Sequence, residues 1–381
     1  MEAEHDGATV KLTCNFLFMC SGYYSYKSGY RPEFAGEADF KGVIVHPQAW
    51  PEDLDYSGKK VVVIGSGATA VTLVPEMAKT AAHVTMLQRS PTYVVSRPAE
   101  DGVANWLRAK LPPMLAYQMT RWKNVLLGMV FFNMARKRPE KTKERILAMV
   151  REKLGPDYDV ETHFTPRYNP WDQRLCLVPD DDLFDAISSG AASVVTDHID
   201  QFTPTGVRLK SGQEIEADVV VTATGLNLEV LGGTQFAVDG KPVVFSETLA
   251  YKGMMYSDVP NLASSFGYTN ASWTLKADLT CGYVCRLLNH MTETGMRQAT
   301  PVRRPGDEGD EAWLDFSSGY VQRSVHLFPK QGNKAPWKQH QNYAKDLIAL
   351  KFGKVDDGVM RFTNPLSLGK PAVQPRASAA A

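Results

Sequence analysis

The alternation of apolar and polar positions predicts one complete strand–turn–helix–strand unit in the first third of the chain. Residues 59–64 (KKVVVI) form an apolar, β-branched run of the kind that a buried parallel strand needs. Residues 68–79 have the apolar spacing of a helix, and residues 83–87 (HVTML) supply a second strand. Together they predict a βαβ unit over residues 59–90.

Elsewhere the pattern mixes short strands with long helical stretches. Residues 8–20 are rich in β-branched and aromatic side chains, which predicts a strand, and residues 218–223 have the character of a buried strand. Residues 103–155 are mostly amphipathic with helical spacing, and a further helix is predicted over about 275–294. Residues 369–381 (GKPAVQPRASAAA) are expected to be disordered.

The turn inside the βαβ unit has the G-x-G-x-x-A pattern of dinucleotide-binding proteins. Gly65 permits a tight turn, Gly67 lets the backbone approach a pyrophosphate, and Ala70 permits close packing of helix on strand. The helix N-terminus would then direct its N–H groups at the phosphates. The predicted cofactor contacts are Gly65, Ser66, Gly67, Ala68, Thr69 and Ala70.

The end of the second strand indicates which nicotinamide cofactor binds. An Asp or Glu there would accept a hydrogen bond from the ribose 2′-hydroxyl of NAD, but this chain has Gln88, Arg89 and Ser90. A guanidinium can pair with a 2′-phosphate through two hydrogen bonds, whereas a carboxylate would repel it. NADP is therefore predicted, with Arg89 and Ser90 as contacts. The alternative is that Arg89 is only a solvated surface charge.

Size and charge narrow the classes of function. A chain of 381 residues is long enough for two or three domains. Its 42 basic and 42 acidic side chains cancel, so it has no field that would collect nucleic acid, and no nucleic-acid partner is expected. The first residues lack the apolar core of a secretory signal, which favours a cytoplasmic location.

One apolar stretch is ambiguous. Residues 125–132 (VLLGMVFF) are too few to span a bilayer, and basic side chains flank them on both sides. A helix packed into the protein core is one interpretation. The other is a helix that lies on a membrane surface and makes a weak peripheral contact through residues 121–138.

The five cysteines are scattered and lack the spacing of metal ligands, so we expect reduced thiols and no metal site. A flavin-dependent disulfide reductase would need two closely spaced redox cysteines beside its flavin. Cys14 and Cys20 lie on one predicted strand with five residues between them, and the chain contains no C-x-x-C motif. That class of enzyme is therefore disfavoured.

Residues 40–51 (FKGVIVHPQAWP) fit the pattern F-x-G-x-x-x-H-x-x-x-W-P at every fixed position. This pattern resembles the fingerprint of Baeyer–Villiger monooxygenases, which with the flavin-containing monooxygenases form the class B flavoprotein monooxygenases. The resemblance implies that His46 and Trp50 couple cofactor binding to domain motion in the catalytic cycle.

Further segments continue the resemblance. Residues 168–174 (YNPWDQR) are similar to the segment that places an arginine beside the flavin, which implies that Arg174 stabilises negative charge on the oxygenated flavin. The alternative for Arg174 is an ion pair with one of the carboxylates at 180–182. Gln173 stands where the family often has Lys, and it is a further candidate contact to NADPH. Thr224 and Gly225 end a strand similar to the one that re-enters the FAD domain, which implies contacts to the cofactor.

The resemblance implies an α/β fold with two dinucleotide-binding, Rossmann-like, three-layer domains, in which the NADP domain is inserted in the FAD domain. The expected division is a remnant of the FAD domain at 1–45, a linker at 46–58, the NADP domain at 59–217 with a helical insert at 103–165, and a second FAD stretch at 218–368 before the tail. The first FAD-binding βαβ unit, which carries G-x-G-x-x-G, is missing from this sequence.

The implied activity is that of a monooxygenase with FAD and NADP as cofactors. NADPH would reduce FAD, and a flavin C4a-peroxide would insert one oxygen atom from O₂ into a ketone, or transfer it to sulfur or nitrogen. The expected partners are a small ketone, sulfide or thioamide and O₂, with no protein partner. The alternative is a truncated, catalytically inactive NADP-binding fragment, for which the missing unit argues directly.

Overall fold

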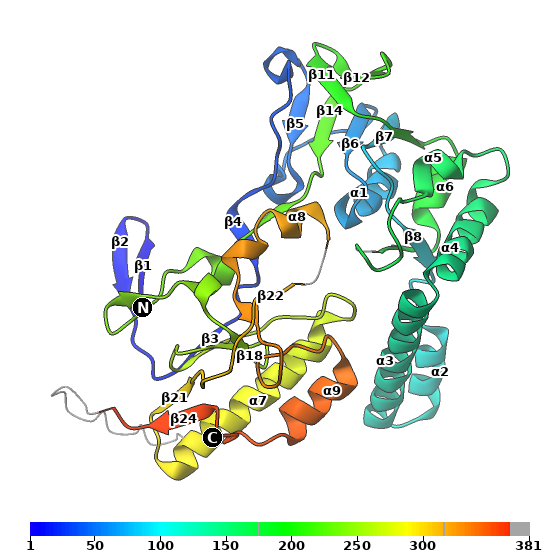
Figure 1. The fold of residues 1–381 in the computed structure, drawn as a ribbon. Coiled ribbons are helices and arrows are strands. Elements are labelled where there is room, and N and C mark those ends of the chain that lie inside the picture. Colours follow the sequence, from blue (N-terminus) through cyan, green and yellow to red (C-terminus); the bar gives the residue numbers. More distant parts are fainter. Residues whose placement is uncertain (174, 315–316, 366–381) are drawn as a thin grey trace.

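The computed structural model describes residues 1–173, 175–314 and 317–365. The predicted tail at 369–381 therefore lies outside the described residues. Within them the helices are α1 (Ala68–Ala78), α2 (Gly102–Lys110), α3 (Pro113–Lys137), α4 (Pro139–Leu154), α5 (Val160–Phe164), α6 (Asp182–Ser188), α7 (Trp273–Thr294), α8 (Gly319–Gln322) and α9 (Tyr343–Leu347) (Figure 1).

A parallel five-stranded sheet forms the upper part of the molecule (Figure 1). We call it the central sheet, and its strand order is β10 (Ala192–Thr196), β7 (His83–Gln88), β6 (Lys60–Ile64), β14 (Val219–Thr222) and β5 (Val43–Val45). All four neighbouring pairs are parallel, as the apolar runs predict.

The central sheet is covered on both faces, which gives three layers. In β6, Val61 and Val63 pack with α1 and α6 on one face, whereas Val62 and Ile64 pack on the other. That second face is covered by an antiparallel sheet of β11 (Ile199–Thr203), β12 (Gly206–Leu209) and β13 (Glu214–Glu216). Burial on both sides explains why residues 61–64 of β6 are all apolar rather than alternating with polar residues.

Two strands of the central sheet lie outside the stretch that was expected to form the NADP domain. Strand β5 lies in the stretch assigned to the FAD remnant at 1–45, and β14 lies in the stretch assigned to 218–368. Both pair with the sheet that carries the glycine turn, since Val220 is aligned with Ile44 on one side and with Val62 on the other. The central sheet therefore extends across the expected boundaries at 45 and 217, from Val43 to Thr222, and the division into domains stays a prediction.

A second, smaller sheet lies in the lower part of the chain. Its order is β18 (Ala250–Tyr251), β19 (Met255–Tyr256), β20 (Leu262–Ser264) and β3 (Leu17–Met19), with β20 and β3 parallel. The predicted single strand over residues 8–20 is wrong, because β2 (Ala8–Lys11) instead forms a fully exposed hairpin with β1 (Glu2–His5) around the turn at Asp6 and Gly7.

Short pairs complete the strands. They are β8 (Val94–Arg97) with β9 (Cys176–Pro179), β16 (Ala237–Val238) with β17 (Lys241–Pro242), β21 (Gln298–Pro301) with β24 (Met360–Thr363), and β22 (Glu311–Ala312) with β23 (Lys330–Gln331). The remaining pair, β4 (Tyr24–Gly29) and β15 (Leu226–Leu228), is antiparallel and lies where the chain passes between the two main sheets (Figure 1).

The helical prediction over 103–155 is confirmed by α2, α3 and α4. The ambiguous stretch 125–132 lies in α3 and agrees fully with neither interpretation. Val125 is buried against α7 and its neighbours, whereas Leu126, Leu127 and Val130 are exposed. One face of this helix is packed on the protein, and another face is open.

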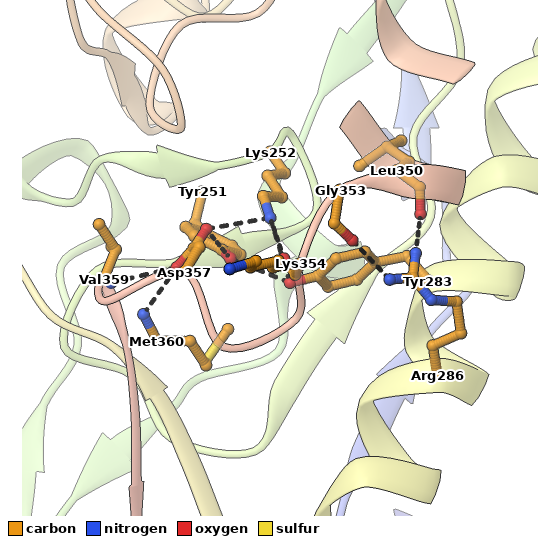
Figure 2. Close-up of polar contacts among 10 residues, drawn as sticks. All are labelled: Tyr251, Lys252, Tyr283, Arg286, Leu350, Gly353, Lys354, Asp357, Val359 and Met360. Carbon is orange, nitrogen blue, oxygen red and sulfur yellow. Dashed lines mark hydrogen bonds and ion pairs between the residues drawn. The ribbon is translucent and has the colours of Figure 1, made fainter. Parts of the chain in front are cut away.

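A buried polar cluster attaches the C-terminal segment to the β18–β19 turn and α7 (Figure 2). The Tyr251 hydroxyl donates a hydrogen bond of 2.8 Å to Asp357, and its oxygen lies 2.9 Å from the Tyr283 hydroxyl. Lys252 Nζ lies 3.0 Å from Asp357 Oδ2, and their side chains are only 10% and 21% exposed. Asp357 also accepts the N–H of Met360 at 3.1 Å. These contacts hold together elements far apart in sequence.

The same cluster extends to the segment that precedes Asp357. Arg286 of α7 donates hydrogen bonds to the carbonyl oxygens of Leu350, Lys351 and Gly353, as Figure 2 shows for Leu350 and Gly353. Burial lowers the pKa of Lys252, while Asp357 opposes that change. Burial by itself would raise the pKa of Asp357, but Lys252 and the hydrogen bonds from Tyr251 and Met360 hold it below its ordinary value.

Replacing Asp357 should destabilise the fold. In Asp357→Ala, Lys252 would keep a buried charge without its carboxylate, which costs roughly 3–5 kcal/mol when a buried pair is broken. Chemical denaturation measures this loss, with Asp356→Ala as the matched control because Asp356 is exposed. Since the folded pKa of Asp357 is depressed, its contribution should be present near neutral pH and vanish as the pH falls below about 4. Equal loss in both variants would contradict the structural role.

Candidate functional site

The glycine turn follows β6 at the carboxyl edge of the central sheet. Gly65 has φ 142°, and a Cβ built on it would lie 2.4 Å from the carbonyl oxygen of Ala223. The Gly65 N–H donates to the carbonyl of Leu87 at 2.8 Å. The turn is therefore fixed between the ends of two neighbouring strands, and only glycine fits there.

The N-terminus of α1 is open. Its N-cap is Gly67, no side chain caps it, and a Cβ on Gly67 would meet no atom within 4 Å. Ala68 and Thr69 are exposed, whereas Ala70 is fully buried against the sheet. Uncapped N–H groups and the positive end of the helix dipole together suit a phosphate. Gly67, Ala68 and Thr69 therefore lie at the open start of the helix, whereas Ala70 packs the helix on the sheet, and contacts of the six turn residues with a pyrophosphate stay a prediction.

The loop after β7 lies beside this turn. The Ser66 hydroxyl donates to the carbonyl of Ser90 at 2.9 Å and contacts the Thr92 hydroxyl at 3.0 Å. Gln88 is buried, and its amide donates to the carbonyl of His163 at 2.7 Å. Arg89 is exposed, and no acidic partner for it exists among the described residues. Arg89 is therefore a free cation next to the turn.

His163 does not add a second charge at this edge. Burial lowers its pKa from the ordinary value, an effect that Asp159 partly opposes. Its Nδ1 lies 2.9 Å from the Thr196 hydroxyl, which also accepts a hydrogen bond from the Gln88 amide. A neutral imidazole near pH 7 leaves Arg89 as the cation that directly follows β7.

Two segments connect the central sheet with the second sheet: β4 with Tyr30 after it, and the stretch from Thr224 into β15. His46 lies between these two connecting segments, where they cross. Its Nε2 is 3.2 Å from the carbonyl oxygen of Gly225, and its Nδ1 accepts the N–H of Gln48 at 3.2 Å. A Cβ on Gly29 would overlap the imidazole, so β4 passes directly over the ring. Trp50 is partly buried against the core of the central sheet, with its ring edge-on to Tyr56 at 6.3 Å.

Thr224 and Gly225 contact the other connecting segment. The Thr224 hydroxyl donates to the carbonyl of Tyr30 at 2.7 Å, and the Tyr30 N–H donates to the carbonyl of Gly225 at 2.9 Å. Together with the contact from His46, these bonds join three stretches of chain at one point. Cofactor contacts by Thr224 and Gly225 remain a prediction.

Arg174 lies outside the described residues, so neither its predicted role nor its alternative ion pair is tested. Its neighbours are placed. Gln173 forms an isolated parallel β-bridge with Pro170 through the backbone. The Asp172 carboxylate accepts a hydrogen bond of 2.7 Å from Arg136. Of the three carboxylates at 180–182, Asp181 pairs with Lys153 at 2.6 Å.

Sequence reasoning missed Arg323. It follows α8, and its guanidinium carbon lies 3.5 Å from the centre of the Tyr30 ring. A guanidinium nitrogen is 3.8 Å from the place of a Cβ on Gly225. Partial burial lowers its pKa, and the described part of the chain offers it no carboxylate. No local motif marks this residue, because about one hundred positions separate it from Gly225 in the sequence.

An aromatic pocket lies at the carboxyl ends of β3 and β20, beside the N-terminus of α7. It encloses about 270 Å³, including space open to solvent, and is lined by Tyr23, Phe266, Tyr268, Thr269, Trp273, Leu314, Tyr320 and Val321. The rings of Tyr23 and Trp273 stack at 5.1 Å. The Ser21 hydroxyl, just after β3, is buried and has no hydrogen-bond partner within the described residues.

The glycine turn and the aromatic pocket suit different kinds of ligand group. The glycine turn offers open N–H groups and a nearby cation, which suits a nicotinamide dinucleotide phosphate. The aromatic pocket, in which the Tyr23 and Trp273 rings stack, suits a planar ring.

The described residues contain neither a metal site nor a membrane-spanning helix. No group of three or more His, Cys, Asp or Glu side chains converges there in a way that could hold a metal ion. The same part of the chain contains no helix with the length and apolarity needed to cross a membrane. All five cysteines are free thiols.

The sequence is similar to known monooxygenases. A family model described as flavin-binding monooxygenase-like matches residues 2–231. The FAD-containing monooxygenase EthA of Mycobacterium tuberculosis is 54% identical over 358 residues, which are 93% of this chain and 73% of that protein. The probable FAD-binding monooxygenase AlmA of Acinetobacter baylyi is 49% identical over 367 residues, which are 94% of this chain and 72% of that protein.

The fold is similar to that of solved structures. An oxidized steroid monooxygenase bound to NADP matches with a TM-score of 0.69 at 18% identity, over 92% of this chain and 75% of that one. OTEMO in complex with FAD and NADP matches with a TM-score of 0.66 at 19% identity, over 95% and 78%. This likeness confirms the expected α/β class with two dinucleotide-binding domains.

The two glycines of the turn should respond differently to alanine. Gly65→Ala places a methyl group against the Ala223 carbonyl and forces an alanine to φ 142°, which should cost about 1–3 kcal/mol of stability. Gly67→Ala adds a methyl group in open space at φ −81° and should change stability by less than about 0.5 kcal/mol. Urea denaturation of both variants measures the difference, and a Gly67 variant as unstable as the Gly65 variant would contradict the geometry.

Proposed function

This chain belongs to the flavin-binding monooxygenase-like family, and we propose that it is an NADPH-dependent flavoprotein monooxygenase. The family predicted from the fingerprint at 40–51 is confirmed by the match over residues 2–231. The proposed reaction transfers one oxygen atom from O₂ into a ketone, or to sulfur or nitrogen of a small molecule. The observation that carries the proposal is the open α1 N-terminus beside Arg89.

NADPH would bind at the carboxyl edge of the central sheet. The N–H groups at the start of α1 would hold the pyrophosphate, with Gly67 leaving room for it. Arg89 and the backbone of Ser90 would meet the 2′-phosphate, because Ser66 holds that loop against the turn. The guanidinium of Arg89 has the planar geometry to donate two hydrogen bonds to this phosphate.

The place where the two connecting segments cross would set the position of bound NADPH relative to the second sheet. His46 contacts the carbonyl of Gly225, so movement of either segment would change this contact. Its proposed role is positional rather than proton transfer. Arg323 lies at the same crossing without an acidic partner in the described chain, and we include it with Arg174 and Gln173 as a residue that would meet the anionic parts of the cofactors.

FAD, when bound, supplies the oxygen chemistry that the family uses. The aromatic residues Tyr23, Phe266 and Trp273 would contact its planar ring from the carboxyl ends of β3 and β20. They would also exclude water from that space.

Flavin binding and turnover test the proposed function directly. The purified chain is mixed with FAD and desalted, and the retained flavin absorbance is measured together with oxygen consumption after NADPH and a cyclic ketone or thioether are added. A monooxygenase retains flavin and consumes oxygen only with NADPH. Binding of NADPH without flavin or oxygen consumption would instead support the inactive NADP-binding fragment.

Arg89→Glu should separate the two nicotinamide cofactors. Loss of the charged hydrogen bonds to the 2′-phosphate, worth about 1.5–3 kcal/mol, should weaken NADPH binding by roughly 10- to 100-fold, whereas NADH binding should change little. Isothermal titration calorimetry measures both affinities. Arg297→Glu is the matched control, since Arg297 is exposed and far from the turn in sequence. Unchanged NADPH affinity would show that Arg89 is only a surface charge.

A further inference from the structure

The helical pair α2 and α3 has an unusual charge. Residues 102–138 contain seven basic side chains and no acidic one, although the whole chain has 42 of each kind. The seven are Arg108, Lys110, Arg121, Lys123, Arg136, Lys137 and Arg138. Figure 1 shows α2 and α3 side by side at the lower right, on the far side of α9 from the second sheet. The positive charge is therefore concentrated on one projecting part of the molecule.

The protein neutralises only some of these charges. Arg121 pairs with Asp278, Lys123 with Asp101, and Arg136 with Asp172. The remaining four, which are Arg108, Lys110, Lys137 and Arg138, are exposed and have no carboxylate partner in the ranges that the structure describes. Lys110 ends α2, and Lys137 and Arg138 end α3, so free cations lie at the ends of both helices.

An exposed apolar stripe runs along α3. Leu115, Met119, Leu126 and Val130 recur at intervals of four, seven and four residues, which places them on one face of the helix. Their exposed fractions are 49%, 46%, 55% and 63%. Because a helix rises 1.5 Å per residue, the stripe is about 22 Å long. A patch of this kind marks an interaction site rather than ordinary surface.

The stripe is distinct from the face by which α3 is attached. Val125 is buried with residues of α7, and Met129 packs against the same cluster. Arg121 donates to Asp278 of α7, and Trp122 meets the Tyr343 ring of α9 edge-on at 5.8 Å. The helix is therefore held on the protein by one side, and the stripe along another side stays free.

We propose that the stripe on α3, together with the free cations at its ends, binds the surface of a membrane that contains anionic lipids. Apolar side chains would enter the boundary between headgroups and acyl chains, and Lys110, Lys137 and Arg138 would meet anionic headgroups. Trp106 of the neighbouring helix α2 is 61% exposed, and such a ring favours that boundary. The absence of acidic residues from 102–138 favours a negatively charged partner, and the proposal is independent of the cofactors.

Vesicle sedimentation tests this surface. The chain is mixed with vesicles of phosphatidylcholine alone, or of phosphatidylcholine with phosphatidylglycerol, and the bound fraction is measured at low and at physiological salt. Binding should require phosphatidylglycerol and weaken as salt rises. The variants Leu126→Gln with Val130→Gln, and Lys137→Gln with Arg138→Gln, should each lower the partition coefficient by roughly 10-fold. Because all four side chains are exposed, the melting temperature should not change.

Matched controls separate this surface from general stickiness and charge. Ile348→Gln with Phe352→Gln removes apolar side chains that are 66% and 70% exposed elsewhere, and Lys210→Gln with Lys241→Gln removes exposed charges outside the helical pair. Both should bind vesicles like the parent. Equal losses in the controls, binding to neutral vesicles, or no binding would overturn the proposal. So would a dimer that Leu126→Gln with Val130→Gln dissociates without any vesicle binding, which would assign the stripe to a second copy of the chain.

Discussion

The approach of two strand ends at the carboxyl edge of the central sheet determines the rest of the site. The carbonyl of Ala223 occupies the space that a side chain on Gly65 would need, so the turn after β6 and the exit from β14 are fixed against each other. From this point α1 begins with an uncapped N-terminus, and the chain leaves toward the second sheet through Gly225. A phosphate site and an interdomain crossing are thus built from one backbone contact.

The contact between Gly65 and Ala223 also explains why polar side chains gather where the two connecting segments cross. Thr224 and His46 bond to carbonyl oxygens of the two connecting segments, and Arg323 stacks on Tyr30. Each of these groups meets a partner from a different stretch of sequence. At the other end of the molecule, the buried pair of Lys252 and Asp357 holds the C-terminal segment on α7 and β18 in the same way. Polar contacts therefore hold the connecting segments in place, while apolar packing stabilises the sheets.

Local patterns predicted what depends on neighbours in sequence. The strand at 60–64, the glycine turn and α1 follow from residue spacing within thirty positions, and so do α2 to α4. The sheet membership of β5 and β14 was missed, because parallel partners more than 150 residues apart leave no local pattern. Residues 8–20 were predicted as one strand because β-branched content does not show where pairing changes from β1 to β20. Arg323 was missed for the same reason of distance.

Hydrogen exchange with and without NADP⁺ shows whether the cofactor phosphates bind at the start of α1, because it reports on the backbone N–H groups themselves. If the cofactor phosphates bind at the start of α1, peptides that contain residues 66–71 should exchange more slowly when NADP⁺ is present, and so should the loop at 89–92. Peptides from β1 and β2, which are exposed and remote in sequence, should not change. Protection elsewhere in the chain, with none at residues 66–71, would contradict the account.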